Sequence, residues 1–513
     1  MTALYPMGAQ MGKQPLTSLK FTCILVSEEN KTIDFGLPCK KGGMDMSKNQ
    51  AASEVKGQHD AIGVAHVTEQ KGLSNPDPCA AWFPEAGLGL FIHWGISTVK
   101  ATLDLSWGMI CGWEFASRRV TADEVAQMNM PLASRKIGKH FTPNQYFALA
   151  KDFKGERFDA DSLIRKAKES GFRYAVFTTR HHDGFAMWPS KFGDFSTRNY
   201  LGGRDFVKEY VNACRKHGLK VGLYYSPPDW HFNRNYMSFL VQTAKTRNPE
   251  LPYLDADYNP TVLPGEAAQK VQNEKYGAYV AGQIEELLTE YGKIDLLWFD
   301  GGMPEGYVYP MEKIRELQPG IVVNPRLHGT GDFETCEVKE AEGRPLGWWE
   351  YCTMWMARGW AYMKGVPYRP LSEITAEYAR TVAWGGNYLP DIGPMADGTL
   401  PPEALQTLDG FAAWRSTHLE AFENTRPLEG EHCSRPASQK GNRRYLYIIP
   451  TEGGEIRLDT ESTVTEAYLL DSRETVAFHQ TEDGGYVFAE PLALSTGVVR
   501  VIAVTVESLS HSK

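Results

Sequence analysis

Two acidic residues in aromatic surroundings are the first candidates for chemistry in this chain. Asp300 follows four apolar residues and precedes two glycines in the segment IDLLWFDGG, residues 294–302. Glu350 lies between tryptophans and a tyrosine in the segment WWEYC, residues 348–352. Poor solvation raises the pKa of a carboxyl group, so Glu350 could serve as a protonated general acid. The structural alternatives are an Asp300 that caps a turn and a Glu350 that pairs with Arg358.

Histidines follow two other apolar runs. His93 comes directly after residues 88–92, and the pair His181 and His182 comes shortly after residues 174–178. Adjacent residues of an extended segment point to opposite sides, so His181 and His182 are not expected to bind one metal ion. The sequence also has no HExxH motif. We therefore predict imidazoles that hydrogen-bond a polyhydroxylated substrate, with no metal and no other cofactor.

The tryptophans are confined to the middle of the chain. All thirteen lie between Trp82 and Trp414. Flat apolar faces of this kind suit a sugar ligand, although large cores use tryptophan as well.

The elements that position these residues alternate along the chain. Short apolar runs indicate strands buried on both faces, at residues 88–92, 174–178, 221–225, 296–299 and 321–323. Segments with helical periodicity lie between or after them, at residues 160–170, 206–217, 278–291 and 372–383. Polar residues follow the strands repeatedly, as they do in barrels whose chemistry sits at the carboxyl ends of the strands. The pattern predicts an α/β fold with a (β/α)8-like (TIM-type) barrel.

Three regions follow from changes in composition. Residues 1–75 are a mixed polar extension of unknown role that we expect to be partly disordered, chiefly across residues 27–71. Residues 76–425 form the predicted catalytic barrel. Residues 426–513 contain short runs of branched and aromatic residues separated by turns, which predicts a small antiparallel β-sandwich.

Composition excludes several classes of function. The chain has 513 residues, 42% of them hydrophobic, and a net charge of −9, which is typical of a globular enzyme and not of a nucleic-acid-binding protein. No apolar run approaches the ~20 residues of a membrane span. The eight cysteines form no CxxC pair, which argues against a zinc knuckle. Without a recognisable signal peptide, the sequence as it stands predicts a cytoplasmic protein. The oligomeric state is not predicted.

Six segments together resemble the glycoside hydrolase family 29 α-L-fucosidases, and they occur in the order of that family. They are FIHWG at 91–95, HHDGFAMWPSKF at 181–192, GLYYS at 222–226, LWFDGG at 297–302, WEYC at 349–352 and GGNYLPDIGP at 385–394.

The resemblance implies an exo-acting, retaining enzyme that releases L-fucose from fucosylated oligosaccharides or glycoconjugates through a covalent fucosyl-enzyme. It assigns Asp300 as the nucleophile and Glu350 as the acid/base. The acid/base position varies within the family, so Glu337 and Glu334 in GDFETCE, residues 331–337, remain alternatives. The resemblance also implies a fucose pocket lined by His93, Trp107, His181, His182, Tyr225, Trp298 and Arg326.

One loop departs from the family pattern. Many members carry Glu-Trp-Tyr where this chain has Ser106, Trp107 and Gly108, so the glutamate contact is lost unless Glu114 replaces it. This departure leaves the fine substrate preference open and slightly favours a binding protein over an enzyme. Three other hypotheses stand beside the fucosidase. They are a hydrolase of a related α-L-glycoside such as an α-L-galactoside, a catalytically weak carbohydrate-binding protein on the same scaffold, and a metal-dependent barrel hydrolase.

Overall fold

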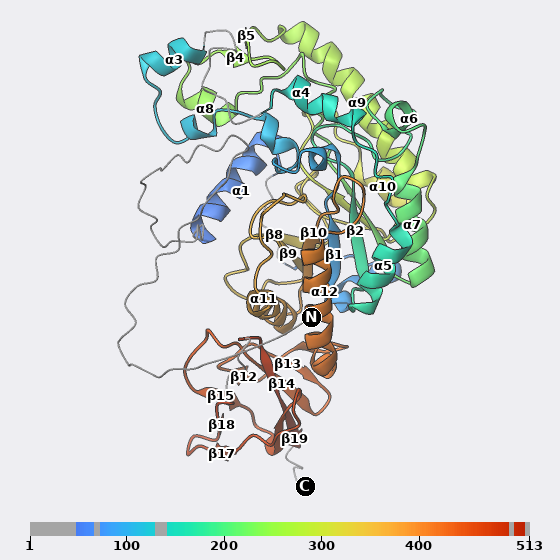
Figure 1. The fold of residues 1–513 in the computed structure, drawn as a ribbon. Coiled ribbons are helices and arrows are strands. Elements are labelled where there is room, and N and C mark those ends of the chain that lie inside the picture. Colours follow the sequence, from blue (N-terminus) through green and yellow to red (C-terminus); the bar gives the residue numbers. More distant parts are fainter. Residues whose placement is uncertain (1–47, 66–71, 129–140, 492–496, 508–513) are drawn as a thin grey trace, which may run out of the picture. The chain divides into compact units, whose positions relative to one another are not determined.

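The computed structural model describes residues 48–65, 72–128, 141–491 and 497–507. Its centre is an eight-stranded sheet in which every neighbouring pair of strands is parallel (Figure 1). The strand order is β7-β6-β3-β2-β1-β10-β9-β8. The strands are β1 (Gly89–Ile92), β2 (Tyr174–Arg180), β3 (Lys220–Tyr225), β6 (Leu296–Phe299), β7 (Val322–Val323), β8 (Glu334–Glu337), β9 (Trp349–Met354) and β10 (Asn387–Ile392).

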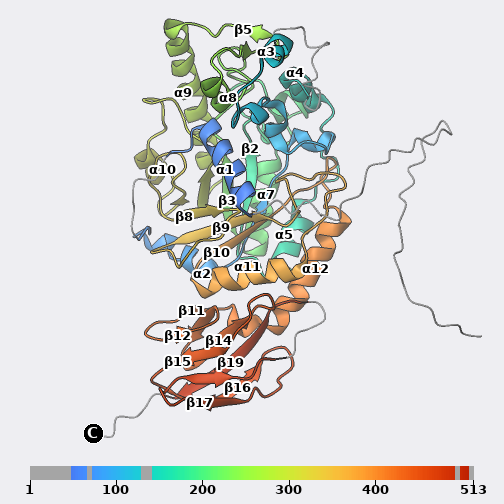
Figure 2. The same ribbon diagram turned by 90° about the vertical axis from the view of Figure 1, so that its left-hand side faces the viewer.

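Helices surround this sheet, as in a TIM-type barrel (Figures 1 and 2). The long ones are α5 (Ala160–Glu169), α7 (Phe206–His217), α9 (Glu266–Thr289), α11 (Leu371–Ala383) and α12 (Pro402–Thr417). Shorter ones are α2 (Phe83–Ala86), α3 (Ala122–Met128), α4 (Pro143–Phe147), α6 (Thr197–Tyr200), α8 (Gln242–Arg247) and α10 (Met311–Leu317), and a small hairpin joins β4 (Tyr253–Leu254) to β5 (Pro260–Thr261). The predicted barrel is confirmed.

The barrel is imperfect next to β8. Segments 324–333 and 338–348, which the structure describes in full, contain no helix. Asp332 closes the gap between β7 and β8, because its backbone N–H donates to the Val323 carbonyl at 2.8 Å and its carboxylate accepts from the Val323 N–H at 2.8 Å. The sequence did not predict β8, because the strand is short and polar and has no apolar run.

Side chains of the barrel strands alternate between two environments. One set points inward and forms a separate cluster that includes Phe91, Tyr174, Tyr224, Trp298 and Cys352. The residues next to them in sequence pack outward with the helices, since successive side chains of a strand face opposite ways. This alternation decides which polar residues reach the barrel mouth.

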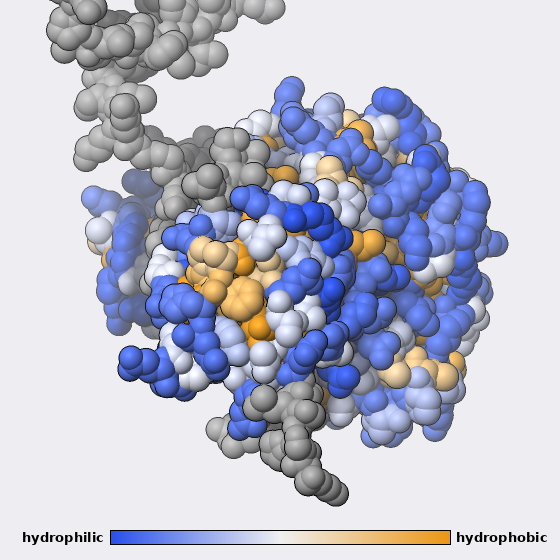
Figure 3. Space-filling model, turned by 90° about the horizontal axis from the view of Figure 1, so that it is seen from below, coloured by the Kyte–Doolittle hydropathy of each residue, from blue (hydrophilic) through white to orange (hydrophobic). Residues whose placement is uncertain are grey.

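The C-terminal region is the predicted sandwich of two antiparallel sheets, which confirms the fold class. One sheet contains β11 (Arg426–Pro427), β13 (Ala437–Lys440), β14 (Arg443–Ile448), β19 (Arg500–Glu507) and β16 (Thr463–Leu469). The other contains β12 (His432–Cys433), β15 (Ile456–Asp459), β18 (Tyr486–Phe488) and β17 (Phe478–Gln480). From below, the visible surface is mostly hydrophilic, with a small apolar area left of its centre and scattered apolar atoms elsewhere (Figure 3).

Helices α11 and α12 connect this sandwich to the barrel. Helix α11 contacts β10 of the barrel and also β11 and β13 of the sandwich. From α12, the Trp414 indole N–H donates to the Val499 carbonyl at 2.8 Å.

Part of the N-terminal extension is helical. Helix α1 (Lys48–Ile62), which falls in the range 27–71 expected to be poorly ordered or loosely attached, belongs to the same compact unit as the barrel, and residues 1–47 and 66–71 lie outside the described residues. Among the described helices, none has the length and apolar character needed to cross a membrane.

We predict that Gly89→Ala lowers the free energy of unfolding, because it overpacks the interior of the barrel. An added Cβ would lie 2.1 Å from the ring of Tyr174, which fills the space beside Gly89 inside the barrel. Overpacking of this kind costs about 1–3 kcal/mol, measurable as the free energy of unfolding in urea. Gly343→Ala is the control, because the backbone there is not in the left-handed region and nothing lies within 4 Å of the added Cβ. Equal stability of the two variants would contradict the packing argument.

Candidate active site

A pocket opens at the carboxyl ends of the barrel strands. Its lining combines carboxylates, imidazoles, an arginine and aromatic rings from β1, β3, β6, β8, the intervening loops and α1. The lining residues are Gln58, His59, Ile62, Phe91, His93, Trp107, His181, Tyr224, Trp298, Asp300, Arg326, Glu337 and Trp360.

Asp300 lies at the end of β6 and points into this pocket. It has the inward direction of Trp298, two residues earlier on the same strand. Its Oδ1 accepts from Arg326 Nη1 at 2.8 Å, and its Oδ2 accepts from the Tyr224 hydroxyl at 2.7 Å. Burial and the charge of Asp300 raise the pKa of Tyr224 well above its ordinary value, so this hydroxyl stays a donor. One oxygen of Asp300 is therefore bound by a positively charged group and the other by a neutral hydroxyl.

Glu337 is the second carboxylate of the pocket. It is the last residue of β8, and its Oε2 accepts from Arg326 Nη2 and, at 2.9 Å, from His59 Nε2. Burial alone would raise the pKa of Glu337, but the charge of Arg326 and the contact with His59 outweigh burial and hold it well below the usual range. One guanidinium therefore binds Asp300 and Glu337 together, each through a different terminal nitrogen.

Glu350 lies inside the barrel, beneath this pocket. It is the second residue of β9, close to the amino end of the strand, and it is fully buried. Its carboxylate accepts from the Tyr174 hydroxyl at 2.5 Å and from the Trp298 indole N–H at 3.0 Å. Burial raises the pKa of Glu350 to about 7, against the lowering effect of both hydrogen bonds. The expected desolvation is present, but Glu350 does not line the pocket that contains Asp300.

The other predicted alternatives occupy different places. Glu334 begins β8, at the end opposite to Glu337, and is exposed. Arg358, the partner considered for Glu350, is not among its hydrogen-bond partners, which are Tyr174 and Trp298. Of the carboxylates considered for acid/base chemistry, Glu337 is the one that shares the pocket with Asp300.

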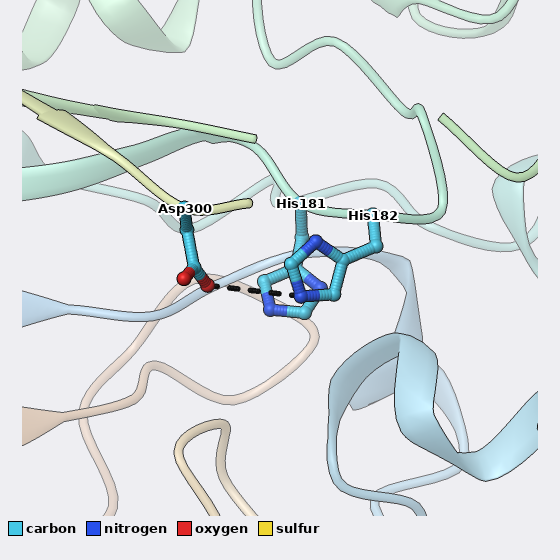
Figure 4. Close-up of side chains that lie close together, drawn as sticks. All are labelled: His181, His182 and Asp300. Atoms are coloured by element: carbon cyan, nitrogen blue, oxygen red, sulfur yellow. Dashed lines mark ion pairs between the residues drawn. The ribbon is translucent and has the colours of Figure 1, made fainter. Parts of the chain in front are cut away.

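The two adjacent histidines do not point apart, which corrects the expectation from sequence. Strand β2 ends at Arg180, so His181 and His182 lie on a turn and their ring centroids are 4.0 Å apart. Figure 4 shows both rings beside Asp300, with His182 Nε2 at 3.7 Å from Asp300 Oδ2. The reasoning from strand alternation was wrong here because the strand had already ended.

Hydrogen bonds on the Nδ1 side give the two rings different roles. Ser106 Oγ accepts the Asp183 N–H at 2.9 Å and lies 2.5 Å from His181 Nδ1, so its hydrogen can be donated to that nitrogen. This assignment leaves His181 Nε2 as a donor. Ser226 instead donates to the Pro228 carbonyl at 3.0 Å, so His182 Nδ1 at 2.6 Å is the donor to Ser226 Oγ.

His182 Nε2 is therefore an acceptor, and it is buried without a hydrogen-bond partner among the described residues. Burial also lowers the pKa of His181 and of His182 well below the ordinary value, so both rings are neutral. A neutral donor beside a neutral acceptor suits hydroxyl groups, each of which can donate and accept.

The same cluster has the composition of a metal site. Ligand atoms of His181, His182 and Asp300 all lie within 4.8 Å of one another. However, both oxygens of Asp300 are already bound, one of them to the Arg326 cation at 2.8 Å. A guanidinium that close opposes a second cation by charge repulsion, so this donor set fits a polyhydroxylated ligand better than a metal ion.

His93 is another residue that lines this pocket. Its Nδ1 lies 2.7 Å from Asp391 Oδ1, and its backbone N–H donates to the same oxygen at 3.1 Å. Asp391 therefore fixes the ring orientation from β10. This is the usual way in which an outer carboxylate orients a functional histidine.

Tyr225 and Tyr224 lie on opposite faces of β3. The predicted residue, Tyr225, faces outward, where its hydroxyl donates to Gln283 at 3.1 Å and its ring stacks on Arg180 at 4.4 Å. Tyr224 faces inward and donates to Asp300. The two consecutive tyrosines indicated the end of the strand, but the sequence did not predict which of them points inward.

Ser106 and Trp107 lie on the loop where this chain departs from the family pattern. Trp107 lines the pocket, and its ring lies edge-on to His182 with centroids 5.1 Å apart. Ser106 is fully buried as the support of His181, whereas Glu114 is exposed and outside the pocket lining. Glu114 therefore does not replace the missing glutamate contact.

Several pocket residues were missed from sequence. Phe91 and Trp360 form an aromatic wall with Trp298, the Phe91 centroid lying 5.1 Å from Trp298 and 6.1 Å from Trp360. Phe91 has the inward direction of His93, so strand alternation could have identified it. His59 could not have been found, because its segment has no strand or motif that connects it to the barrel.

A TIM-type barrel with two carboxylates and neutral histidines at the carboxyl ends of its strands is the arrangement expected of a glycoside hydrolase. A model of the alpha-L-fucosidase family matches residues 59–420, and the chain therefore belongs to the alpha-L-fucosidase family. It is 26% identical over 456 residues to the tissue alpha-L-fucosidase of Homo sapiens, covering 84% of this chain and 89% of the human protein.

Solved structures agree. Alpha-L-fucosidase isoenzyme 1 from Paenibacillus thiaminolyticus superposes with a TM-score of 0.63 at 26% identity, covering 84% of this chain and 99% of that one. An alpha-L-fucosidase from Bacteroides thetaiotaomicron, trapped as a covalent intermediate, has the same fold, with a TM-score of 0.66 at 21% identity over 86% of this chain and 99% of that one.

We predict that Glu350→Gln gains stability relative to wild type as the pH rises. Between the ordinary pKa of 4.5 and the folded value of about 7, the unfolded chain loses this proton while the folded protein keeps it. The free energy of unfolding of wild type therefore falls across that interval, by roughly 3 kcal/mol at most. The amide of the variant does not titrate, so urea unfolding at about pH 5 and about pH 8.5 should show the difference widening at the higher pH.

Glu334→Gln, at the exposed start of β8, is the matched control for this experiment and should leave the pH dependence of unfolding as in wild type. A Glu350→Gln curve parallel to that of wild type would contradict the burial argument.

We also predict that substitution of the two tyrosines of β3 affects turnover to different extents. Tyr224→Phe removes the donor to Asp300 and should lower turnover about tenfold or more, because a hydrogen bond to a charged group is lost. Tyr225→Phe removes an outward contact with Gln283 and should change turnover by about threefold or less. Equal losses in both variants, measured as kcat on an aryl fucoside, would contradict the assigned directions.

Proposed function

We propose that this alpha-L-fucosidase family member hydrolyses α-L-fucosides of fucosylated glycans with net retention, with Asp300 as the nucleophile and Glu337 as the acid/base. The observation that carries the proposal is the binding of both carboxylates by one guanidinium at the mouth of the barrel. Retaining glycosidases need two carboxyls about 5–5.5 Å apart, and a shared guanidinium is a spacer of that order. The position of Glu350 under the pocket favours Glu337 for the second role.

In the first step, Asp300 attacks the anomeric carbon and Glu337 donates a proton to the departing glycosidic oxygen. The carbon–oxygen bond to the leaving group breaks as the ester bond to Asp300 forms. The Tyr224 hydroxyl on Oδ2 keeps the attacking carboxylate oriented. In the second step, Glu337 removes a proton from water, which attacks the same carbon and releases Asp300.

The ionisation of Glu337 bears on both steps. Its lowered pKa in the free protein suits the second step, in which it acts as a base. The first step needs a protonated Glu337. We therefore expect bound substrate to replace the contact between Arg326 and Glu337, because loss of the neighbouring positive charge raises the pKa of a carboxyl group.

The pocket lining supports fucose over a related sugar. His181 as donor and His182 as acceptor are placed for ring hydroxyls. The rings of Phe91, Trp298 and Trp360 offer an apolar surface for the methyl group of fucose, which a galactoside lacks.

Azide distinguishes the two carboxylates. Asp300→Ala should lose about a thousandfold or more of its activity on 4-nitrophenyl α-L-fucoside, and azide should restore turnover with β-L-fucosyl azide as the product. Glu337→Ala should form the fucosyl-enzyme from this activated substrate and give α-L-fucosyl azide. The same α product from Glu350→Ala, with none from Glu337→Ala, would reverse the assignment of the acid/base.

Wild type is the reference in the same assay. Its activity should persist in chelator, whereas loss of activity there would support a metal-dependent hydrolase. Hydrolysis of the α-L-galactoside but not of the α-L-fucoside would show that the preferred sugar is galactose. No hydrolysis of either substrate would support a carbohydrate-binding protein.

A further inference from the structure

Helix α1 of the N-terminal extension supplies one wall of the pocket. Gln58, His59 and Ile62 line it, and their spacing places them on one side of the helix. Lys56 and Asp60 pair with each other on an exposed part of the helix, at 3.0 Å. The pocket is thus completed by a helix that precedes the first strand of the barrel.

The end of α1 is fixed to the same backbone that carries the catalytic groups. The Ile62 carbonyl accepts the Gly302 N–H at 2.9 Å, and the Arg326 carbonyl accepts the Ala65 N–H at 2.8 Å. A Cβ at position 302 would lie 2.1 Å from the Gly63 carbonyl oxygen, so glycine is required there for this approach. These backbone hydrogen bonds therefore fix the position of helix α1 relative to Asp300 and Arg326.

His59 contacts the carboxylate assigned to acid/base chemistry. Its Nε2 lies 2.9 Å from Glu337 Oε2, the same oxygen that Arg326 binds. Both side-chain contacts made to Glu337 by the described residues thus use Oε2, which leaves Oε1 to face the glycosidic oxygen. We infer that His59 is a positioning residue that holds the Glu337 carboxylate for proton transfer, and that the α1 wall is the side of the pocket where the leaving group lies.

This inference rests on the proposed role of Glu337. When substrate displaces Arg326 from Oε2, His59 remains as the donor that fixes the direction of the carboxylate. Proton donation to a leaving group depends on that direction, because the hydrogen bond weakens steeply when it is misaligned. The side chain of His59 is 27% exposed, so the leaving group can reach it from the pocket mouth.

A series of aryl α-L-fucosides tests this role. 2,4-Dinitrophenolate departs with little protonation, whereas phenol needs the acid. His59→Leu removes the donor at similar size and should lower kcat/KM for the phenyl fucoside about tenfold or more, but that for the dinitrophenyl fucoside by about threefold or less. His59→Gln, whose amide can donate from nearly the same place, should keep both values within about threefold of wild type.

Lys56→Ala is the matched control on the exposed part of α1 and should leave both substrates unaffected. His59→Asn, whose amide is too short to reach Glu337, is a second donor-deficient variant that preserves the test if His59→Leu does not fold. Equal losses on both substrates, or no loss on either, would overturn the positioning role. A wild type that cleaves neither fucoside would instead overturn the proposed function itself.

Discussion

The sharing of Arg326 by Asp300 and Glu337 is the interaction on which the site depends. Two buried carboxylates at one pocket would repel each other and lose hydration, and one guanidinium compensates both costs while fixing their separation. Arg326 is itself held from several directions. Its guanidinium lies 4.5 Å above the ring of Trp298, and its carbonyl accepts the Ala65 N–H. The helix-free segment after β7, closed by Asp332, is what brings this arginine to the barrel mouth.

The alternation of strand side chains arranges the groups below and around this ion pair. Inward residues of β3, β6 and β9 form a column in which Trp298 links two levels, since its indole donates to Glu350 and its face underlies Arg326. Gly89 leaves room for Tyr174, which completes the binding of Glu350. The carboxyl group inside the barrel, Glu350, is therefore buried among aromatic rings and can be neutral. The carboxyl group at the barrel mouth, Glu337, is charged. This difference in environment gives Glu337 and Glu350 opposite pKa shifts.

The parts of the pocket that carry no charge are suited to binding a sugar. His181 and His182 stay neutral through burial, and their serine partners assign one as a donor and the other as an acceptor. Ser106, at the place where the loop departs from the usual family pattern, is the partner of His181, so this departure has a structural role in the site. Helix α1 adds a polar and an apolar side chain at the rim and contacts Glu337 directly.

The sequence by itself determined the barrel, the sandwich, the family and the candidate Asp300, because repeated short apolar runs and motifs in a fixed order can be recognised without coordinates. The tertiary structure decided the rest. It separated Tyr224 from Tyr225 and Glu337 from Glu350, since strand ends and side-chain directions depend on register with neighbouring strands. It turned His181 and His182 toward one ligand site because β2 ends one residue before them. It also brought His59 to Glu337 across 278 positions of sequence, a contact that arises from packing of α1 against the Gly302 turn and leaves no local pattern.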